Sequence, residues 1–360
     1  MKALSRGERI TVALAALFTA FAAALHFMHA GPILGFIVSA AALSMLAAVV
    51  GKGTEQIGSR LGAGATGVLQ SALGNLPELF ICVFSLRAGL VDVVKAALIG
   101  SILANSLLVL GIAITVGGLK HGTQRFSAES PRMIATLMLI SVTALAVPTL
   151  AQQLHTPAGS HEAALSAACA IVLIVVFLAS LPFSLRGDTV AESPVRAAAV
   201  KAEPAHAAWP MALAITLLAV AGIAAAFASE WFVDAMLPAT HALGISEAFT
   251  GFVIVAIAGN AVENVVGIQL AAKNQPDYAL SVVLNSSFQI ALLLTPVLVL
   301  VSFFVGPTPL TLVLSPLLVA ALALATIVTA FVTLDGESIW AEGVALIGLY
   351  CIIAAAFWWG

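Results

Sequence analysis

The stretch Gly74–Glu78 reads GNLPE, and the stretch Gly259–Glu263 reads GNAVE. Each lies inside a long apolar run, and an offset of 185 residues superimposes one on the other. The same offset also aligns two further pairs of polar residues, Asp92 with Asp277 and Ser101 with Ser286. Polar residues of these types are uncommon in apolar runs, so their coincidence at one offset predicts an internal repeat.

The composition around these stretches predicts an integral membrane protein. Of 360 residues, 61% are hydrophobic and only 9% are charged, whereas a soluble domain is about 25% charged. So few charges would not cover the surface of a soluble protein of this length. The net charge of −3 with no basic patch also excludes a nucleic-acid binder.

Apolar runs of about 20 residues or more predict eleven membrane-spanning helices. Turn residues or charges separate most of these runs, as in GKGTEQIGSR (51–60). The predicted spans are 10–29, 32–51, 62–86, 91–117, 132–152, 163–185, 210–236, 247–272, 278–305, 310–333 and 340–358. We interpret the first as a membrane helix rather than a cleaved signal peptide, because no convincing cleavage site follows it.

The repeat offset places five spans between equivalent helices. Because five is odd, the two halves cross the bilayer in opposite senses, as in many transporters. The expected fold is therefore all-α, with one N-terminal helix and two inverted five-helix repeats. The predicted parts are the N-terminal helix 1–30, the first repeat 31–186 with its motif 62–117, a cytoplasmic linker 187–208 that we interpret as a solvated tether, and the second repeat 209–360 with its motif 247–305.

Lysines and arginines predict the orientation in the membrane, because cytoplasmic loops carry an excess of them. With the N-terminus in the cytoplasm, twelve of the fourteen basic residues fall on the cytoplasmic side, leaving only Arg87 and Lys95 outside. From the compact loops and the lack of a long targeting extension we expect a bacterial inner membrane, and the membrane of a eukaryotic organelle is the alternative.

Glu78 and Glu263 are the carboxylates placed deepest in the predicted spans. A carboxylate inside a membrane is costly and is a functional candidate by default. Each has an asparagine three residues before it, Asn75 and Asn260, on the same helical face. The glycines Gly74 and Gly259 are expected to weaken the helix one turn before each glutamate, as is Pro77 in the first motif.

The neighbouring spans supply further side-chain oxygens. Ser101 and Asn105 share one face of span 91–117, and Ser286 and Gln289 share one face of span 278–305. The predicted site is therefore lined by oxygen atoms alone, which suits a hard cation. Two glutamates neutralise a divalent ion, and this favours Ca²⁺ over Mg²⁺, which gives up its water reluctantly. Mn²⁺, Na⁺ and K⁺ remain compatible with the same ligands.

An empty site would leave two buried carboxylates near each other. Burial and like-charge repulsion both favour their protonated form, so protons are expected to replace a departing cation. Competition between a cation and protons for one pair of carboxylates is in itself a mechanism of exchange.

The two stretches GNLPELFICVFSLRAGLVDVVKAALIGSILANSLLVLG and GNAVENVVGIQLAAKNQPDYALSVVLNSSFQIALLLTPVLVL resemble the two α-repeats of the cation/proton exchangers, the CAX branch of the Ca²⁺/cation antiporter superfamily. The resemblance implies a sodium/calcium-exchanger-like fold in which paired glutamates bind Ca²⁺ and protons alternately. It assigns this role, and the role of metal ligands, to Glu78 and Glu263, and it makes Asn75, Asn260, Ser101, Asn105, Ser286 and Gln289 their polar surroundings. Pro77 and Asn285 depart from the CAX pattern.

The resulting expectation is a secondary antiporter that exports cytoplasmic Ca²⁺ in exchange for protons, with no cofactor. A monovalent cation/proton antiporter is the nearest alternative, and a channel is a further one. An intramembrane enzyme is disfavoured, because the sequence lacks a nucleophile constellation, a HExxH helix and an Asp-rich diphosphate motif.

Three other residues receive structural interpretations. Asp92 and Asp277 begin equivalent spans, and we interpret them as charges that complement the helix dipole. His26, which lies outside the repeat, is interpreted as a packing residue.

Overall fold

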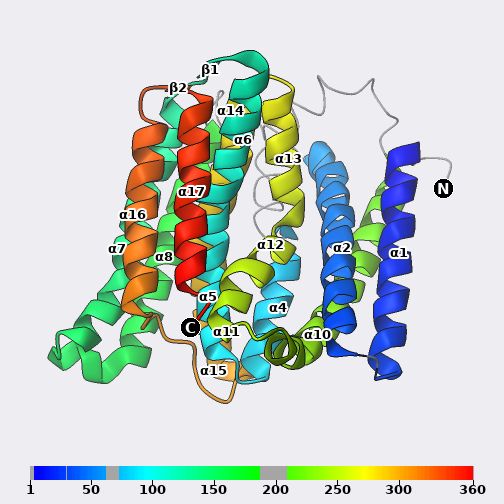
Figure 1. Cartoon of the computed structure of the whole chain (residues 1–360), viewed down its shortest axis with the longest axis horizontal. Coiled ribbons are helices and arrows are strands. Elements are labelled where there is room, and N and C mark those ends of the chain that lie inside the picture. Colours follow the sequence, from blue (N-terminus) through cyan, green and yellow to red (C-terminus); the bar gives the residue numbers. More distant parts are fainter. Residues whose placement is uncertain (1–3, 30, 62–72, 187–208, 360) are drawn as a thin grey trace.

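The structure is a computed structural model that describes residues 4–29, 31–61, 73–186 and 209–359. It is a bundle of long, mostly upright helices (Figure 1). The predicted linker 187–208 lies outside the described residues. The N-terminal half contains α1 (Arg6–Phe27), α2 (Pro32–Leu61), α4 (Leu76–Arg87), α5 (Val91–Leu103), the π-helical turn η1 (Ala104–Val109), α6 (Leu110–His121), β1 (Gln124–Arg125), α7 (Glu129–Gln153), the 3₁₀ turn η2 (Pro157–His161) and α8 (Glu162–Arg186).

The C-terminal half repeats much of this order. It contains α10 (Met211–Leu243), α11 (Glu247–Phe249), the π-helical turn η3 (Thr250–Val255), α12 (Ala256–Gly259), α13 (Ala261–Ala272), α14 (Pro276–Gln289), the π-helical turn η4 (Ile290–Leu294), α15 (Thr295–Val305), α16 (Pro316–Val332), β2 (Glu337–Ser338) and α17 (Trp340–Ala356).

The number of membrane-spanning helices can be assessed from their length and apolar character. Among the described residues, seven helices are long and apolar enough to cross a membrane, or eight if the bent pair Glu247–Gly259 and Ala261–Ala272 forms one span. The apolar helices α16 and α17 have 17 residues each. The chain is therefore a multi-pass helical membrane protein. The count of eleven spans stays a prediction, because residues 62–72 of one predicted span lie outside the described part of the chain.

The segment 51–60 was expected to be a turn between spans, and this expectation is wrong. α2 continues through it to Leu61. Gly53 serves close packing rather than a turn, because a Cβ there would stand 3.2 Å from the Cβ of Leu218 on α10. Lys52 and Glu55, one helical turn apart, form an ion pair at 3.4 Å.

The predicted span 310–333 also requires correction, because its first six residues are not helical. α16 begins at Pro316, where proline is tolerated at a helix start, and Ser315 caps it by accepting a hydrogen bond from the Leu318 N–H at 3.3 Å. Hydrogen bonds from the N–H groups of Leu312 to Ser166 (2.9 Å) and of Leu314 to Thr149 (2.9 Å) hold the preceding segment against α7 and α8.

The all-α prediction holds except for one small feature. β1 and β2 pair antiparallel, with Gln124 opposite Ser338 and Arg125 opposite Glu337. They join the loop after α6 to the loop after α16 on one face of the molecule (Figure 1).

The helices α5 and α6 form the centre of the bundle. Of an apolar stretch of 18 residues within Val91–His121, 89% are buried. α2 packs along α10, with the rings of Phe36 and Phe232 stacked 4.7 Å apart. α1 packs mainly on α2 at the edge of the molecule (Figure 1).

The two halves run in opposite senses around the centre. α4 runs from mid-height toward one face of the molecule, whereas α13 runs from mid-height toward the other (Figure 1). The π-helical turns η1 (Ala104–Val109) and η4 (Ile290–Leu294) also coincide, since the repeat offset carries 104–109 onto 289–294. Both observations are what an inverted repeat predicts.

Candidate cation-binding site

Glu78 and Glu263 both lie in the first turn of a helix that starts in the middle of the bundle. α4 starts at Leu76, directly after the turn at Gly74 and Asn75. In the second half, α12 ends at Gly259 and the chain bends by 64° into α13. The predicted weakening of the helix before each glutamate is thus seen in both halves. A helix N-terminus favours negative charge, so both breaks suit a carboxylate.

Glu78 is completely buried, with 0% of its surface exposed. Its Oε1 accepts a hydrogen bond from the Ser101 hydroxyl on α5. Its side chain also packs against the helix break of the other half, where a Cβ at Gly259 would lie 3.2 Å from the Glu78 Cβ. Glycine at this position therefore lets the two halves meet at the carboxylate.

A chain of hydrogen bonds extends from Glu78 across both halves. The Asn260 amide donates to the Ser101 hydroxyl at 3.1 Å. The Ser286 hydroxyl donates to Asn260 Oδ1 at 3.3 Å, and the Asn105 amide donates to the Ser286 hydroxyl at 2.8 Å. The structure thus brings five of the eight predicted site residues into one network.

Asn75 and Gln289 form a second contact between the halves. The Asn75 amide donates to Gln289 Oε1 at 3.4 Å. The pair lies at the start of α4 and at the end of α14, where η4 begins.

Glu263 has more open surroundings than Glu78. Glu263 is only partly buried and lines a cavity of about 500 Å³. Gly74, from the motif of the first half, lines the same cavity. The described lining of this cavity comes mainly from α1, α2 and α13, with polar groups from Ser5, Glu8, Lys52, Glu55 and Gln269. Glu263 lies one helical turn after Gly259, which packs against the Glu78 side chain.

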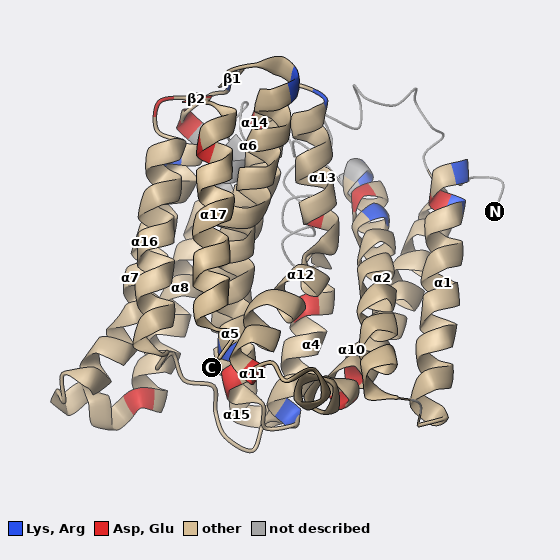
Figure 2. Ribbon diagram, viewed as in Figure 1, with Lys and Arg blue, Asp and Glu red and all other residues tan. Residues whose placement is uncertain are grey.

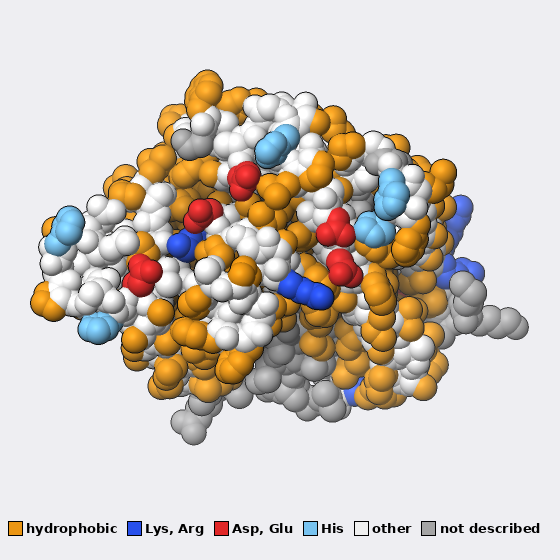
Figure 3. Space-filling model, turned by 90° about the horizontal axis from the view of Figure 1, so that it is seen from below, with side chains coloured by type: hydrophobic (Ala, Val, Ile, Leu, Met, Phe, Trp, Pro, Cys, Tyr) orange, Lys and Arg blue, Asp and Glu red, His pale blue; other side chains and the backbone are white. Residues whose placement is uncertain are grey.

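Glu78 and Glu263 lie apart from most of the other charged residues of the protein. Figure 2 shows most charges at the two ends of the bundle and isolated acidic positions at mid-height. The end nearest the cavity carries basic residues of α1, α2, α6 and β1 (Figure 2), whereas Arg87 ends α4 and Lys95 lies near the start of α5, at the opposite end of these helices. That opposite face, seen in Figure 3, carries several acidic and histidine side chains.

Two buried acceptor oxygens in the network have no hydrogen-bond partner among the described residues. They are Glu78 Oε2 and Asn105 Oδ1. An unpaired buried oxygen is costly, and a bound cation or a proton would satisfy it. The site is thus able to hold a hard cation through carboxylate, amide and hydroxyl oxygens.

Two neighbours of the site were missed from the sequence. Asn264 follows Glu263 directly, and its Oδ1 is buried without a described partner. Thr54 lines the cavity from α2, and its hydroxyl is likewise unpaired within the described residues. The position of Asn264, directly after the motif glutamate, was a signal that could have identified it from the sequence. Thr54 gave no such signal, because it lay in a segment expected to be a turn.

The residues given structural interpretations behave in different ways. Asp277 lies in the first turn of α14, as a dipole-complementing charge would, and also accepts a hydrogen bond from the Ser127 N–H at 2.7 Å. Asp92 is exposed in the first turn of α5. His26 stacks on Trp231 at 5.8 Å and lies 3.9 Å from an Asp234 oxygen.

Comparison with known proteins places the chain in a family. The model of the sodium/calcium exchanger protein family matches residues 31–186 and 213–359, so the chain belongs to this family. Among curated relatives, it is 35% identical to a Ca²⁺/H⁺ antiporter of Synechocystis over 356 residues, covering 93% of each chain. It is 33% identical to the Ca²⁺/H⁺ antiporter ChaA of Bacillus subtilis, covering 92% of this chain and 93% of the relative.

Solved structures show the same architecture. The structure of native YfkE matches with a TM-score of 0.80 at 31% identity, covering 97% of this chain and 99% of YfkE. The H⁺/Ca²⁺ exchanger CAX matches with a TM-score of 0.75 at 15% identity, covering 98% of this chain and 92% of the other, which shows a shared fold. The predicted resemblance to the CAX branch is confirmed.

Proposed function

We propose that this protein is a secondary Ca²⁺/H⁺ antiporter that exports cytoplasmic Ca²⁺ by alternating access. Relatives named as Ca²⁺/H⁺ antiporters, similar over nearly the whole chain, support this function. The observation that carries the proposal is the contact of Glu78 with both halves, through the Ser101 hydroxyl on one side and Gly259 on the other. A carboxylate shared in this way is able to respond to a movement of one half against the other.

We assign cation and proton binding to Glu78 and Glu263. Two charged carboxylates in a water-poor interior are costly unless their charge is neutralised. One Ca²⁺ or two protons neutralise the pair. The protein is therefore able to change between its two access conformations with either load bound, but not with the two carboxylates empty and charged. Asn75, Asn260, Ser101, Asn105, Ser286 and Gln289 complete the proposed site, and no resident cofactor is required.

The proposed orientation places the N-terminus and the cavity at Glu263 on the cytoplasmic side of a bacterial inner membrane. The concentration of basic residues at that end supports this orientation. The proposed division into an N-terminal helix and two repeats is compatible with the two segments matched by the family model. We retain eleven spans as part of this proposal.

The test is ion-dependent proton movement in proteoliposomes that contain a pH-sensitive dye. We expect Ca²⁺ to drive proton movement. Glu78→Gln or Glu263→Gln should reduce it by about a hundredfold or more, because the neutral amide neither binds and releases a proton nor offers a negative charge to the cation. Glu162→Gln, a partly exposed carboxylate at the start of α8, serves as the control and should keep full activity.

The same vesicles separate the alternatives. Proton movement driven by Na⁺ or K⁺ but not by Ca²⁺ would replace this proposal with a monovalent antiporter. Full Ca²⁺-driven activity in either glutamine variant would remove the two glutamates from the site. A single-channel current would instead indicate a channel.

A further inference from the structure

The large cavity at Glu263 opens between two helices that have equivalents in the other half. It is lined mainly by α2 and α13, together with part of α1. The repeat offset of 185 residues relates α2 to α10, and it relates α4 to α13. The helices of the equivalent pair, α4 and α10, pack closely together. One pair of helices therefore borders a cavity, whereas the equivalent pair forms a packed contact, which we call the α4–α10 seam.

Apolar side chains fill the α4–α10 seam. Ile81 and Phe84 of α4 pack in one hydrophobic cluster with Val233 of α10. By the repeat offset, Ile81 corresponds to Val266, and Phe84 corresponds to Gln269. Both counterparts line the open cavity. Positions that face the cavity in one half therefore exclude water in the other half.

Ser229 occupies the position on α10 that Ser44 occupies on α2. Ser44 lines the open cavity, and its hydroxyl donates to the Ala40 carbonyl oxygen at 2.9 Å. Ser229 is instead fully buried, with 0% of its surface exposed, and its hydroxyl has no hydrogen-bond partner among the described residues. Because an unpaired buried hydroxyl is costly, Ser229 lacks a polar partner that it needs in this conformation.

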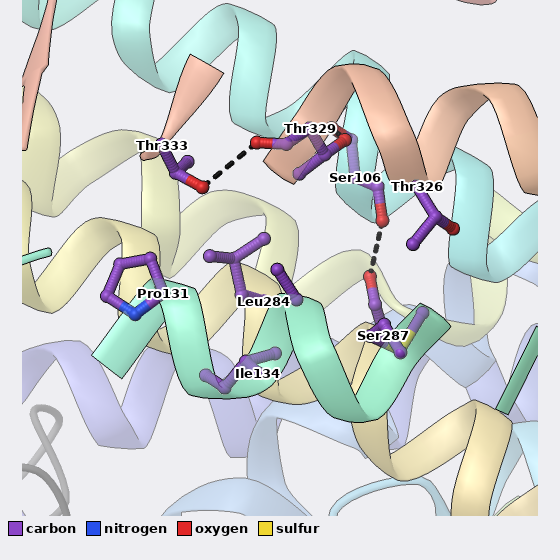
Figure 4. Close-up of a pocket in the computed structure, with 10 residues that line it drawn as sticks. Ser106, Pro131, Ile134, Leu284, Ser287, Thr326, Thr329 and Thr333 are labelled. Atoms are coloured by element: carbon purple, nitrogen blue, oxygen red, sulfur yellow. Dashed lines mark hydrogen bonds between the residues drawn. The ribbon is translucent and has the colours of Figure 1, made fainter. Parts of the chain in front are cut away.

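Buried hydroxyls on the other side of the central helices differ from Ser229. In a small cavity between η1, α7, α14 and α16, the Ser106 and Ser287 hydroxyls lie 3.0 Å apart (Figure 4). The Thr333 hydroxyl beside them donates to the Thr329 carbonyl oxygen at 2.9 Å (Figure 4). These groups satisfy one another within the fold, so they need no partner from a second conformation.

Two carboxylates accompany Ser229 on α10. Glu230 and Asp234 correspond by the repeat offset to Met45 and Val49, which line the open cavity. Glu230 is partly buried, whereas Asp234 is exposed and lies 3.9 Å from His26 Nδ1. Hydroxyl and carboxylate oxygens are ligands that a hard cation prefers. α10 therefore carries such oxygens at positions where its equivalent, α2, borders the open cavity.

We propose that the cation leaves the protein along the α4–α10 seam when this seam opens, and that Ser229, Glu230 and Asp234 line its path. The inference rests on the proposed antiport by alternating access. In an inverted repeat, the two halves exchange their arrangements when access changes sides, so the closed pair of helices takes the place of the open pair. The Ser229 hydroxyl then gains water or the passing cation as the partner that it lacks in the closed seam.

Thiol modification from each side of the membrane tests this path. In a background without the three native cysteines, the probes are Ser229→Cys and Val233→Cys, and Val233 corresponds to Ala48 of the open cavity. The reagent is a charged methanethiosulfonate that does not cross the membrane. The matched control is Ala228→Cys, because Ala228 adjoins Ser229 and is equally buried, while its counterpart Leu43 is not among the described residues that line the cavity.

We expect ongoing Ca²⁺/H⁺ exchange to speed the reaction of Ser229→Cys and Val233→Cys in right-side-out vesicles by about tenfold over the resting protein, because only an exposed thiolate reacts. Ala228→Cys should stay unreactive in both states, and Ser44→Cys should react in inside-out vesicles. Modified Ser229→Cys should no longer exchange, because the attached group obstructs the path. Ca²⁺-driven proton movement before modification reports that each variant is folded.

Two outcomes would overturn the path. If neither probe reacted faster than Ala228→Cys during exchange, the α4–α10 seam would stay closed while the cation leaves elsewhere. If Ser229→Cys reacted but kept full exchange after modification, the seam would open without carrying the cation. A parent protein without Ca²⁺-driven proton movement would instead overturn the proposed antiport, so the two failures are distinguishable.

Discussion

Glu78 and Glu263 occupy the same place in two related motifs, yet their surroundings differ. Glu78 is completely buried and hydrogen-bonded to Ser101. Glu263 is partly buried and faces the large cavity, while Ser286, the counterpart of Ser101, bonds to Asn260 instead. The difference shows that the two halves adopt different arrangements around one centre, as a transporter does when only one side is open.

The largest expected effect concerns access from the cavity. In a background without Cys82, Cys169 and Cys351, we expect Glu263→Cys to react with a membrane-impermeant thiol reagent about a hundredfold faster than Glu78→Cys, because only an exposed thiolate reacts. Modification in inside-out vesicles, quantified by mass spectrometry, measures both rates. Equal rates would contradict the difference between the two glutamates, and preferential reaction in right-side-out vesicles would reverse the proposed orientation.

The next effect concerns the hydroxyl partners of the two halves. Ser101→Ala removes the donor to Glu78, and losing a hydrogen bond to a charged group costs about 1.5–3 kcal/mol. We expect the half-saturating Ca²⁺ concentration to rise by about tenfold or more. Ser286→Ala touches only the amide network and should raise it by about threefold. If both variants weakened Ca²⁺ equally, the asymmetry of the network would play no part in binding.

The smallest effect concerns the contact between Glu78 and the opposite helix break. Gly259→Ala adds a Cβ 3.2 Å from that of Glu78, so the glutamate must shift by a few tenths of an ångström. We expect a loss of transport of about threefold, because the shift that overpacking requires here is small. Gly222→Ala is the control, because a Cβ there meets nothing within 4 Å. Unchanged transport in Gly259→Ala would mean that the close approach is dispensable.

The repeated motifs made much of the site predictable. One offset linked Glu78 to Glu263 and Ser101 to Ser286, and the structure joins Glu78, Ser101, Asn260, Ser286 and Asn105 by hydrogen bonds. Residue types and helical spacing carried this information because a polar group in a membrane must find a partner.

Other features depend on tertiary packing, which local patterns do not record. The glycines of 51–60 were taken for turn residues, although Gly53 lies inside α2 and lets it approach α10 closely. The π-helical turns η1 and η4 leave no trace in apolar periodicity. The different exposure of the two glutamates reflects the arrangement of the halves in one conformation, which similar motifs do not distinguish.

Proton release on Ca²⁺ binding tests the central claim most directly. Calorimetric titration of the purified protein with Ca²⁺, in buffers of different ionisation enthalpy and at a pH low enough to protonate the empty site, counts the protons released. Competition at Glu78 and Glu263 predicts about two protons per Ca²⁺, because two coupled carboxylates give up both protons to a divalent ion. Ca²⁺ binding without proton release, or unchanged release in a Glu78→Gln/Glu263→Gln variant, would contradict it.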